Sequence, residues 1–436
     1  MEELNYQRSG KMTSNKRNKP VRQKMPEQVR IAMYDVGFGD CFLLSFSYAD
    51  GEARRVLIDC GSTSENKKHM SQVVNILVDD CEGHIEAIVA THRHRDHISA
   101  FGLKGLGEKL EKLNPEIVIQ PWTEHPDAEE AAIEAPSVFT AGAVRHLRSL
   151  DAAQEFAEHL INRPNNILSA AGPRTRSRVV RLASLSIPNK KAIERLTRMG
   201  KKHAYVHSGS QSGLERLLPG VQVSVLGPPT LTQTQSIRKQ TQWDEDEFWK
   251  LFARVAAISA SNIATARGRS DLFPKARTDT IAKSPSYVKW LIKRLDRAQL
   301  HNVQRIVRAL DRALNNTSVI LLFKIGDKML LFPGDAQLEN WQYALKDRKL
   351  KRRLSKVLLY KVGHHGSTNA TPKSLWNLFA RRSANDGRLI SLLSTKRGHH
   401  SEVPRTSLVK ALESETVLHS TQGWRRKLRE EYTILE

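Results

Sequence analysis

Short apolar runs separated by glycine-containing or polar turns predict β-strands from residue 29 onward. In the first part of the chain these runs cover residues 29–36, 41–46, 55–61, 85–90 and 116–120. A segment of helical periodicity lies between the third run and the fourth, and another follows the fourth. Strands that alternate with helices are typical of an α/β protein in which helices cover the sheet.

The pattern changes after an apolar run at residues 221–229, which ends at a glycine and two prolines. Residues 230–314 have helical periodicity, most clearly at 243–260 and 287–314. We interpret this segment as a helical insertion that either caps a functional site or forms a dimer surface. Strand-like runs then return at residues 319–323, 329–332, 357–362 and 389–394.

The N-terminal segment differs from the rest of the chain because it is polar and basic and has almost no apolar periodicity. Such a segment cannot bury enough surface to offset its chain entropy, so we expect a disordered basic arm over residues 1–28. The remaining residues, 29–436, are expected to form one domain. Its parts are a first half at 29–229, the helical insertion at 230–314 and a second half at 315–436.

The apolar run at 85–90 leads directly into the sequence THRHRDH at residues 91–97. Imidazole and carboxylate groups commonly bind first-row divalent metals, and four of them fall here at the end of a buried strand. Alternate side chains of an extended segment share a face, so His92 and His94 can hold one metal ion. Asp96 and His97 then turn toward a second position. The segment therefore predicts a metal site.

Residues 91–97 resemble the second signature motif of the metallo-β-lactamase fold superfamily, and the rest of the chain supplies motifs similar to its others in the expected order. The strand that ends at Asp59 resembles the first motif. Asp335, after a predicted hairpin, resembles the bridging aspartate, and the His-His-Gly-Ser sequence at 364–367 resembles the fifth motif. The resemblance implies a four-layer αββα sandwich in which two mixed sheets face each other.

The opening sequence DVGFGD at residues 35–40 resembles one branch of this superfamily. That branch includes the hydrolase domain of bacterial competence DNA-uptake proteins. The chain departs from it at two positions: Phe38 stands where the branch often has glutamine, and Gln337 stands where close relatives have glutamate.

The resemblance also implies two divalent metal ions, for which zinc is expected and manganese also fits. The expected ligands are His92 and His94 for the first ion, Asp96, His97 and His365 for the second, and Asp335 between them. The third ligand of the first ion stays open between His125, His207 and none.

Asp59 is expected to orient a ligating histidine. We expect catalytic roles for Asp96 and His364, with His364 facing the substrate. Which of His364 and His365 binds metal stays open, although the resemblance favours His365.

The chain has 69 lysines and arginines against 46 acidic residues, a formal net charge of +23. Such a charge attracts polyanions over long distances, so nucleic acid is the expected partner. The alternative is a host whose proteins are generally basic. The segment between residues 163 and 202 contains many basic residues but a single acidic one. We predict a nucleic-acid surface in this segment, formed by Arg174, Arg176, Arg178 and Arg181.

Three functions fit these observations. The first is a two-metal phosphodiesterase or nuclease, which the charge and the DNA-uptake-like motifs favour. The second is a hydrolase of a small ester, lactone or lactam, for which the charge has no evident use. The third is a nonenzymatic nucleic-acid-binding subunit of a larger system, which the complete set of ligand residues disfavours. A protein partner, or self-association through the helical insertion, is compatible with each.

Two absences complete the sequence interpretation. The chain has no run of about eighteen apolar residues, so we expect no membrane span and a cytoplasmic protein. Its three cysteines have no paired Cys-x-x-Cys spacing, which disfavours both a disulfide framework and a thiolate zinc site.

Overall fold

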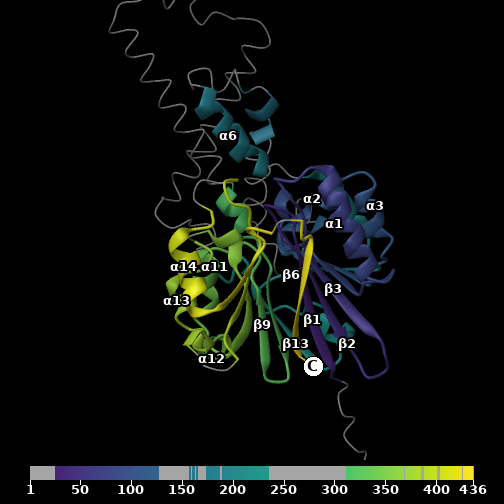
Figure 1. Cartoon of the computed structure of the whole chain (residues 1–436), viewed down its shortest axis with the longest axis vertical. Coiled ribbons are helices and arrows are strands. Elements are labelled where there is room, and N and C mark those ends of the chain that lie inside the picture. The colour runs from purple at the N-terminus through teal and green to yellow at the C-terminus, as the bar shows by residue number, and fades with distance from the viewer. Residues whose placement is uncertain are drawn as a thin grey trace, which may run out of the picture.

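The computed structural model describes residues 25–126, 157–158, 160–162, 164, 173–186, 189–234, 311–367, 369–383, 387–399, 403–424 and 426–435. Most of the basic arm expected at 1–28 and most of the helical insertion expected at 230–314 lie outside the described residues. The expected division of the chain into parts therefore stays a prediction. Figure 1 shows the described elements in colour.

Among the described residues, the first sheet has seven strands in the order β13-β1-β2-β3-β4-β5-β6. Neighbours are antiparallel from β13 to β3 and parallel from β3 to β6. The strands are β1 (Gln28–Tyr34), β2 (Cys41–Ser47), β3 (Ala53–Cys60), β4 (Ala87–Val89), β5 (Ile117–Pro121), β6 (Lys202–Val206) and β13 (Arg429–Leu435).

The second sheet has six strands among the described residues, in the order β12-β11-β10-β9-β8-β7. Here the parallel part runs from β12 to β9, and the antiparallel part runs from β9 to β7. The strands are β7 (Val221–Gly227), β8 (Ile320–Ile325), β9 (Lys328–Phe332), β10 (Val357–Lys361), β11 (Ile390–Leu393) and β12 (Val417–Ser420). Both sheets are therefore mixed, and the expected α/β class is confirmed.

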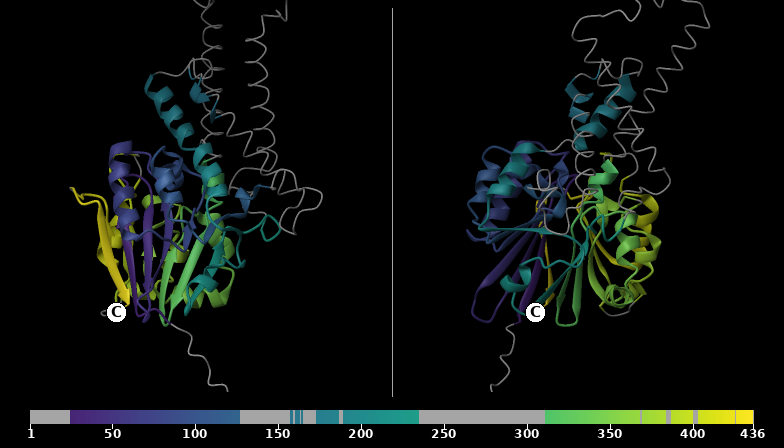
Figure 2. Two further views of the ribbon diagram at one scale, coloured as in Figure 1. Left: turned by 90° about the vertical axis from the view of Figure 1, so that its right-hand side faces the viewer. Right: turned by 180° about the vertical axis from the view of Figure 1, so that it is seen from behind.

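Helices lie on the outer faces of the two sheets, as Figures 1 and 2 show from three directions. The first sheet is covered by α1 (Lys67–Asp80), α2 (Arg95–Gly102), α3 (Leu106–Glu111) and α7 (Lys190–Arg198). The second is covered by α11 (Leu338–Ala344), α12 (Arg348–Leu354), α13 (Lys373–Trp376) and α14 (Thr406–Glu415).

The remaining helical segments are short or stand apart from these faces. They are α6 (Pro173–Ser186), α8 (Leu214–Leu217), η1 (Trp122–Glu124), η5 (Gly363–Gly366) and η6 (Ala380–Ser383). Among the described residues, no helix combines the length and the apolar character that crossing a membrane requires.

The core divides into three clusters because successive side chains of a strand point to opposite faces of its sheet. In β4, Val89 joins the cluster between the two sheets, whereas Ile88 joins the cluster beneath α1 and α2. Phe332 of β9 lies in the same central cluster, and Trp341 of α11 lies in the third cluster, over the second sheet. Each such fully buried side chain contributes roughly 1.5–3 kcal/mol to folding.

Each sheet combines strands from distant parts of the chain. Strand β7 comes from the first half, yet it pairs with β8 in the second sheet. Strand β13, at the end of the chain, returns to the first sheet and pairs with β1, with Ala32 opposite Glu431. Each sheet thus contains a strand from the other half, which ties the two sheets together through the chain itself.

Candidate metal centre

The ends of parallel strands in the two sheets bring the candidate residues together. Asp59 lies at the end of β3, the segment 91–97 follows β4, Asp335 follows β9, and His365 follows β10. The carboxyl ends of parallel strands meet at one edge of a sheet, where loops can converge on a ligand. Here the loops of both sheets converge, and Asp59, Asp335 and His365 are at most 1% exposed.

Asp59 fixes the loop that carries the motif. Its carboxylate accepts hydrogen bonds from the backbone N and the hydroxyl of Thr91, both at 2.7 Å. It also lies 2.7 Å from Nδ1 of His97. Because a carboxylate only accepts, Nδ1 carries a proton, and Nε2 of His97 faces the centre, where a bound cation would take the place of a proton on it. Asp59 has a φ of +58°, a strained conformation that aims its carboxylate at this loop.

A glycine allows the second sheet to approach the motif loop. Gly334 has a φ of +55°, and a Cβ atom there would lie 2.9 Å from Cβ of Thr91. Any larger residue would therefore push β9 away from β4. The close contact places the next residue, Asp335, against His97, with Oδ2 of Asp335 3.1 Å from Nε2 of His97.

Four potential ligands form a compact buried group: Asp96, His97, Asp335 and His365. Their ligand atoms all lie within 4.8 Å of one another. Nε2 of His365 is 3.2 Å from Oδ2 of Asp96 and 3.7 Å from Oδ2 of Asp335. Nδ1 of His365 donates to the carbonyl of Ser394 at 3.1 Å, which leaves Nε2 as the free ligand atom.

The hydrogen bonding of this group indicates that it could hold metal ions. Buried polar atoms normally have partners, and an orphan needs a physical reason. In this group Oδ1 of Asp96, Nε2 of His97, Nε2 of His365 and both carboxylate oxygens of Asp335 have none that meets hydrogen-bond geometry. A cation bound among these atoms would satisfy all of them.

His92 and His94 lie beside this group. Nε2 of His92 is 2.9 Å from Nδ1 of His94, and the rings of His92 and His97 are 4.2 Å apart. Nε2 of His94 is buried without a hydrogen-bond partner. Within the described residues, no group of three or more potential ligands contains His125 or His207. The third ligand of the first ion therefore stays open.

The two histidines after β10 differ in position. His364 and His365 have φ values of +46° and +52°, which are unfavourable for residues with a Cβ atom. The His365 side chain is fully buried, whereas that of His364 is 19% exposed. Nε2 of His364 lies 3.7 Å from Oδ2 of Asp335. The strained turn thus buries one imidazole in the group and leaves the other at its rim.

Burial and neighbouring charges set the protonation of the site. Burial lowers the pKa of His92 and, for His94, lowers it to about 4, so both imidazoles are neutral at pH 7 and free to bind metal. Burial alone would raise the pKa of Asp335, but the histidines around it outweigh that effect and lower it. The carboxylate is therefore ionised at neutral pH.

Two residues that sequence reasoning left without a role lie directly behind the centre. Oδ1 of Asp40 is 3.5 Å from Nδ1 of His365. Oδ2 of Asp40 is 3.7 Å from Nδ1 of His97 and forms an ion pair with Nζ of Lys361. That ammonium group also lies 3.3 Å from the carbonyl of Gly334 and 3.8 Å from Oδ1 of Asp335. Burial would lower the pKa of Lys361, but Asp40 and Asp335 raise it, so it stays charged.

A signal for this pair was present in the sequence. Lys361 is a single charged residue in the otherwise apolar run at 357–362, and a lysine at 2% exposure needs a partner. Asp40 ends the turn after β1, where its backbone N donates to the carbonyl of Asp96 at 2.9 Å. Neither position revealed which residue it would meet.

The Lys361→Met substitution is expected to destabilise the metal-free protein by roughly 3–5 kcal/mol, because it leaves Asp40 and Asp335 buried without their cation. The penalty should be smaller with zinc present, since a divalent ion supplies positive charge beside Asp335. Thermal unfolding in chelator and in zinc measures both effects.

Lys356→Met is the matched control, because Lys356 is exposed just before β10. It should leave the unfolding temperature nearly unchanged in both buffers. Equal stability of Lys361→Met and the unaltered protein in chelator would contradict the role of Lys361 as a buried counter-charge.

The predicted nucleic-acid surface falls on α6. The side chains of Arg174, Arg178 and Arg181 lie outside the described residues, and that of Arg176 is partly buried. This surface therefore stays a prediction.

Comparison with known proteins assigns no family. No family model matches the chain, and no curated protein matches it. The geometry of the candidate centre therefore carries the functional argument.

Proposed function

We propose that the chain is a metallo-β-lactamase fold hydrolase with the four-layer αββα arrangement. It resembles the branch that includes the hydrolase domain of competence DNA-uptake proteins. Its activity would be two-metal hydrolysis of a phosphodiester in nucleic acid or a nucleotide. The observation that carries the proposal is the buried group of Asp96, His97, Asp335 and His365, whose ligand atoms come from both sheets and lack hydrogen-bond partners.

The donor set fits two divalent cations. Asp96, His97 and His365 would hold one, His92 and His94 the other, and Asp335 would lie between them. Imidazole and carboxylate ligands without thiolate suit zinc and also accept manganese. When bound, such a pair supplies a water of lowered pKa and positive charge that stabilises the attacked group.

The remaining residues would position and protonate. Asp59 holds His97 in the tautomer that leaves Nε2 free. Asp40 and Lys361 hold Asp335 and His365 from behind. His364, partly exposed at the rim, would donate a hydrogen bond to a phosphoryl oxygen or protonate the leaving group.

The charge of the chain supports a polyanionic substrate. A net charge of +23 raises the local concentration of nucleic acid and has no evident use for a small neutral ester. We propose a cytoplasmic enzyme with nucleic acid as its partner. The helical insertion at 230–314 is proposed to cap the site or to join protomers, and the residues from 235 to 310 are not described.

A cleavage screen tests the proposed function. Purified protein should hydrolyse bis-p-nitrophenyl phosphate or single-stranded DNA when zinc or manganese is added, and chelator should abolish the activity. Metal content by atomic emission should exceed one ion per chain. Nitrocefin and simple esters serve as competing substrates, and a preference for either would favour the ester, lactone or lactam hydrolase. Bound nucleic acid without metal or turnover would favour the nonenzymatic subunit.

A further inference from the structure

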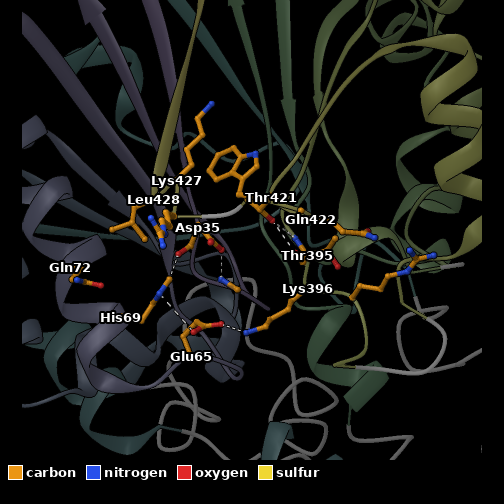
Figure 3. A pocket seen from close by; sticks show the side chains of 15 residues that line it. Asp35, Glu65, His69, Gln72, Thr395, Lys396, Thr421, Gln422, Lys427 and Leu428 are labelled. Carbon is orange, nitrogen blue, oxygen red and sulfur yellow. Dashed lines mark hydrogen bonds and ion pairs between the residues drawn. The ribbon is translucent and has the colours of Figure 1, made fainter.

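A cavity of about 630 Å³ opens beside the candidate metal centre. It is lined by the turn after β1 at Asp35 and Gly37, by the start of α1, by residues 395–397 after β11, and by the loop between β12 and β13. Figure 3 shows side chains of these segments facing a common space. We call this cavity the flank groove. Its volume lies within the range of about 300–1,000 Å³ usual for small-ligand sites.

The segments that line the flank groove continue directly into residues that contact the metal centre. The ring of Phe38, which follows Gly37, lies 4.4 Å from the ring of His365. Ser394 accepts a hydrogen bond from Nδ1 of His365, and the next residue, Thr395, lines the groove. Thr395 is held by Thr421 through hydrogen bonds in both directions at 2.9 Å. Two lining residues, Gly37 and Thr395, are thus each one position in the sequence from a residue that contacts His365.

The charges of the groove favour an anionic ligand. Four cationic side chains line it, those of Lys396, Arg397, Arg426 and Lys427, against the two carboxylates of Asp35 and Glu65. Lys396 pairs with Glu65, as Figure 3 shows, and Lys427 pairs with Glu430 at 3.0 Å.

Two cations remain for a ligand. Arg397 and Arg426 are exposed, and within the described part of the chain no carboxylate forms an ion pair with either. Two unpaired guanidinium groups at the rim of one cavity can each contact a phosphate.

The groove also contains an aromatic side chain. Trp424 lines it, packs against the core between the sheets, and lies beneath Lys427, whose Nζ is 5.1 Å from the ring centroid. Sites for single-stranded nucleic acid combine cationic side chains that follow the backbone with aromatic rings that contact bases. The flank groove has both features at the edge of a centre suited to phosphodiester hydrolysis.

We propose that the flank groove binds the nucleotides next to the phosphodiester that reaches the metal centre, on a single strand of nucleic acid. Arg397 and Arg426 contact phosphates, and Trp424 contacts a base. The cavity is too small for a duplex and large enough for one or two nucleotides. The inference rests on the proposed function for the nature of the substrate, but binding to the groove does not require turnover.

The experiment uses the full chain and a fluorescein-labelled hexathymidylate, with binding measured by fluorescence anisotropy in chelator so that no hydrolysis occurs. The double variant Arg397→Ala/Arg426→Ala should bind about tenfold more weakly at low salt. The slope of log affinity against log salt should become shallower by about 1.4, because each phosphate contact on a single strand contributes about 0.7. Trp424→Leu should weaken binding without changing the slope.

The matched control is Arg348→Ala/Arg352→Ala, which removes the same charge from exposed positions on α12. Figure 1 shows α12 at the opposite end of the sheets from α2. This control should bind within about twofold of the unaltered protein. If the two double variants lose affinity equally, only net charge matters and the groove is not a specific site. Unchanged affinity in Arg397→Ala/Arg426→Ala would also contradict the proposal.

A parallel assay separates this inference from the proposed function. Hydrolysis of bis-p-nitrophenyl phosphate by the unaltered protein reports on the metal centre alone. If the protein hydrolyses the substrate but Arg397→Ala/Arg426→Ala binds the oligonucleotide normally, the proposed function stands and the binding role of the groove is contradicted. If binding depends on the groove but no phosphodiester is hydrolysed, the binding role stands and the proposed function is contradicted. If millimolar inorganic phosphate fully displaces the bound oligonucleotide, the groove is a simple phosphate site and the nucleic-acid assignment is contradicted.

Discussion

The Asp335→Ala protein is expected to bind less metal and to hydrolyse phosphodiesters roughly a thousandfold more slowly, or worse, while it remains folded. Oδ2 of Asp335 lies 3.1 Å from Nε2 of His97 and 3.7 Å from Nε2 of His365, so this oxygen is close to both imidazoles. Alanine removes this link between the two sheets at the centre. Atomic emission, turnover and circular dichroism measure the three effects.

Stability in the absence of metal should fall only modestly. The substitution removes the carboxylate that His97 and Lys361 face, but it also relieves the repulsion between Asp335 and Asp96, so the metal-free variant should unfold within a few degrees of the unaltered protein. Asp327→Ala is the matched control, because Asp327 is exposed in the turn at the other end of the same hairpin. Asp96→Ala should reproduce the loss of metal and activity. Full metal content and activity in both Asp335→Ala and Asp96→Ala would show that the centre lies elsewhere.

Local patterns predicted most strands because strand periodicity and turn residues depend only on residues that are close together in the sequence. The hairpin that leads to Asp335 and the run that leads to His365 both form as strands β8 to β10. The return of β13 to β1 was not predicted. Its residues alternate only weakly, with four charged positions in the segment 427–431, so nothing local distinguishes an edge strand from a loop.

The candidate site shows the same limit. Histidines and aspartates clustered at strand ends were visible as potential ligands, and the structure brings Asp96, His97, Asp335 and His365 together. The partnership of Asp40 with Lys361 was not visible, because the two residues are 321 positions apart and meet only after both sheets have formed. Long-range ion pairs depend on topology, which a single sequence does not specify.

The last prediction separates two adjacent residues, His364 and His365. His365→Ala should lower metal content together with activity, because this imidazole is fully buried and presents Nε2 to Asp96 at 3.2 Å. A buried ligand of this kind is not easily replaced by water. His364→Ala should keep its metal, because His364 lies at the rim with its side chain 19% exposed. Its effect should be a fall in kcat on the order of 10²–10⁴, as for a positioned acid or hydrogen-bond donor.

Metal content and turnover measured on the same samples decide between the two roles. His84→Ala is a suitable control, because His84 is a partly exposed histidine before β4 whose imidazole lies 3.7 Å from Glu86. It should change neither quantity. Loss of metal from His364→Ala with retention in His365→Ala would reverse the two assignments. Retention in both would mean that the turn after β10 supplies no ligand.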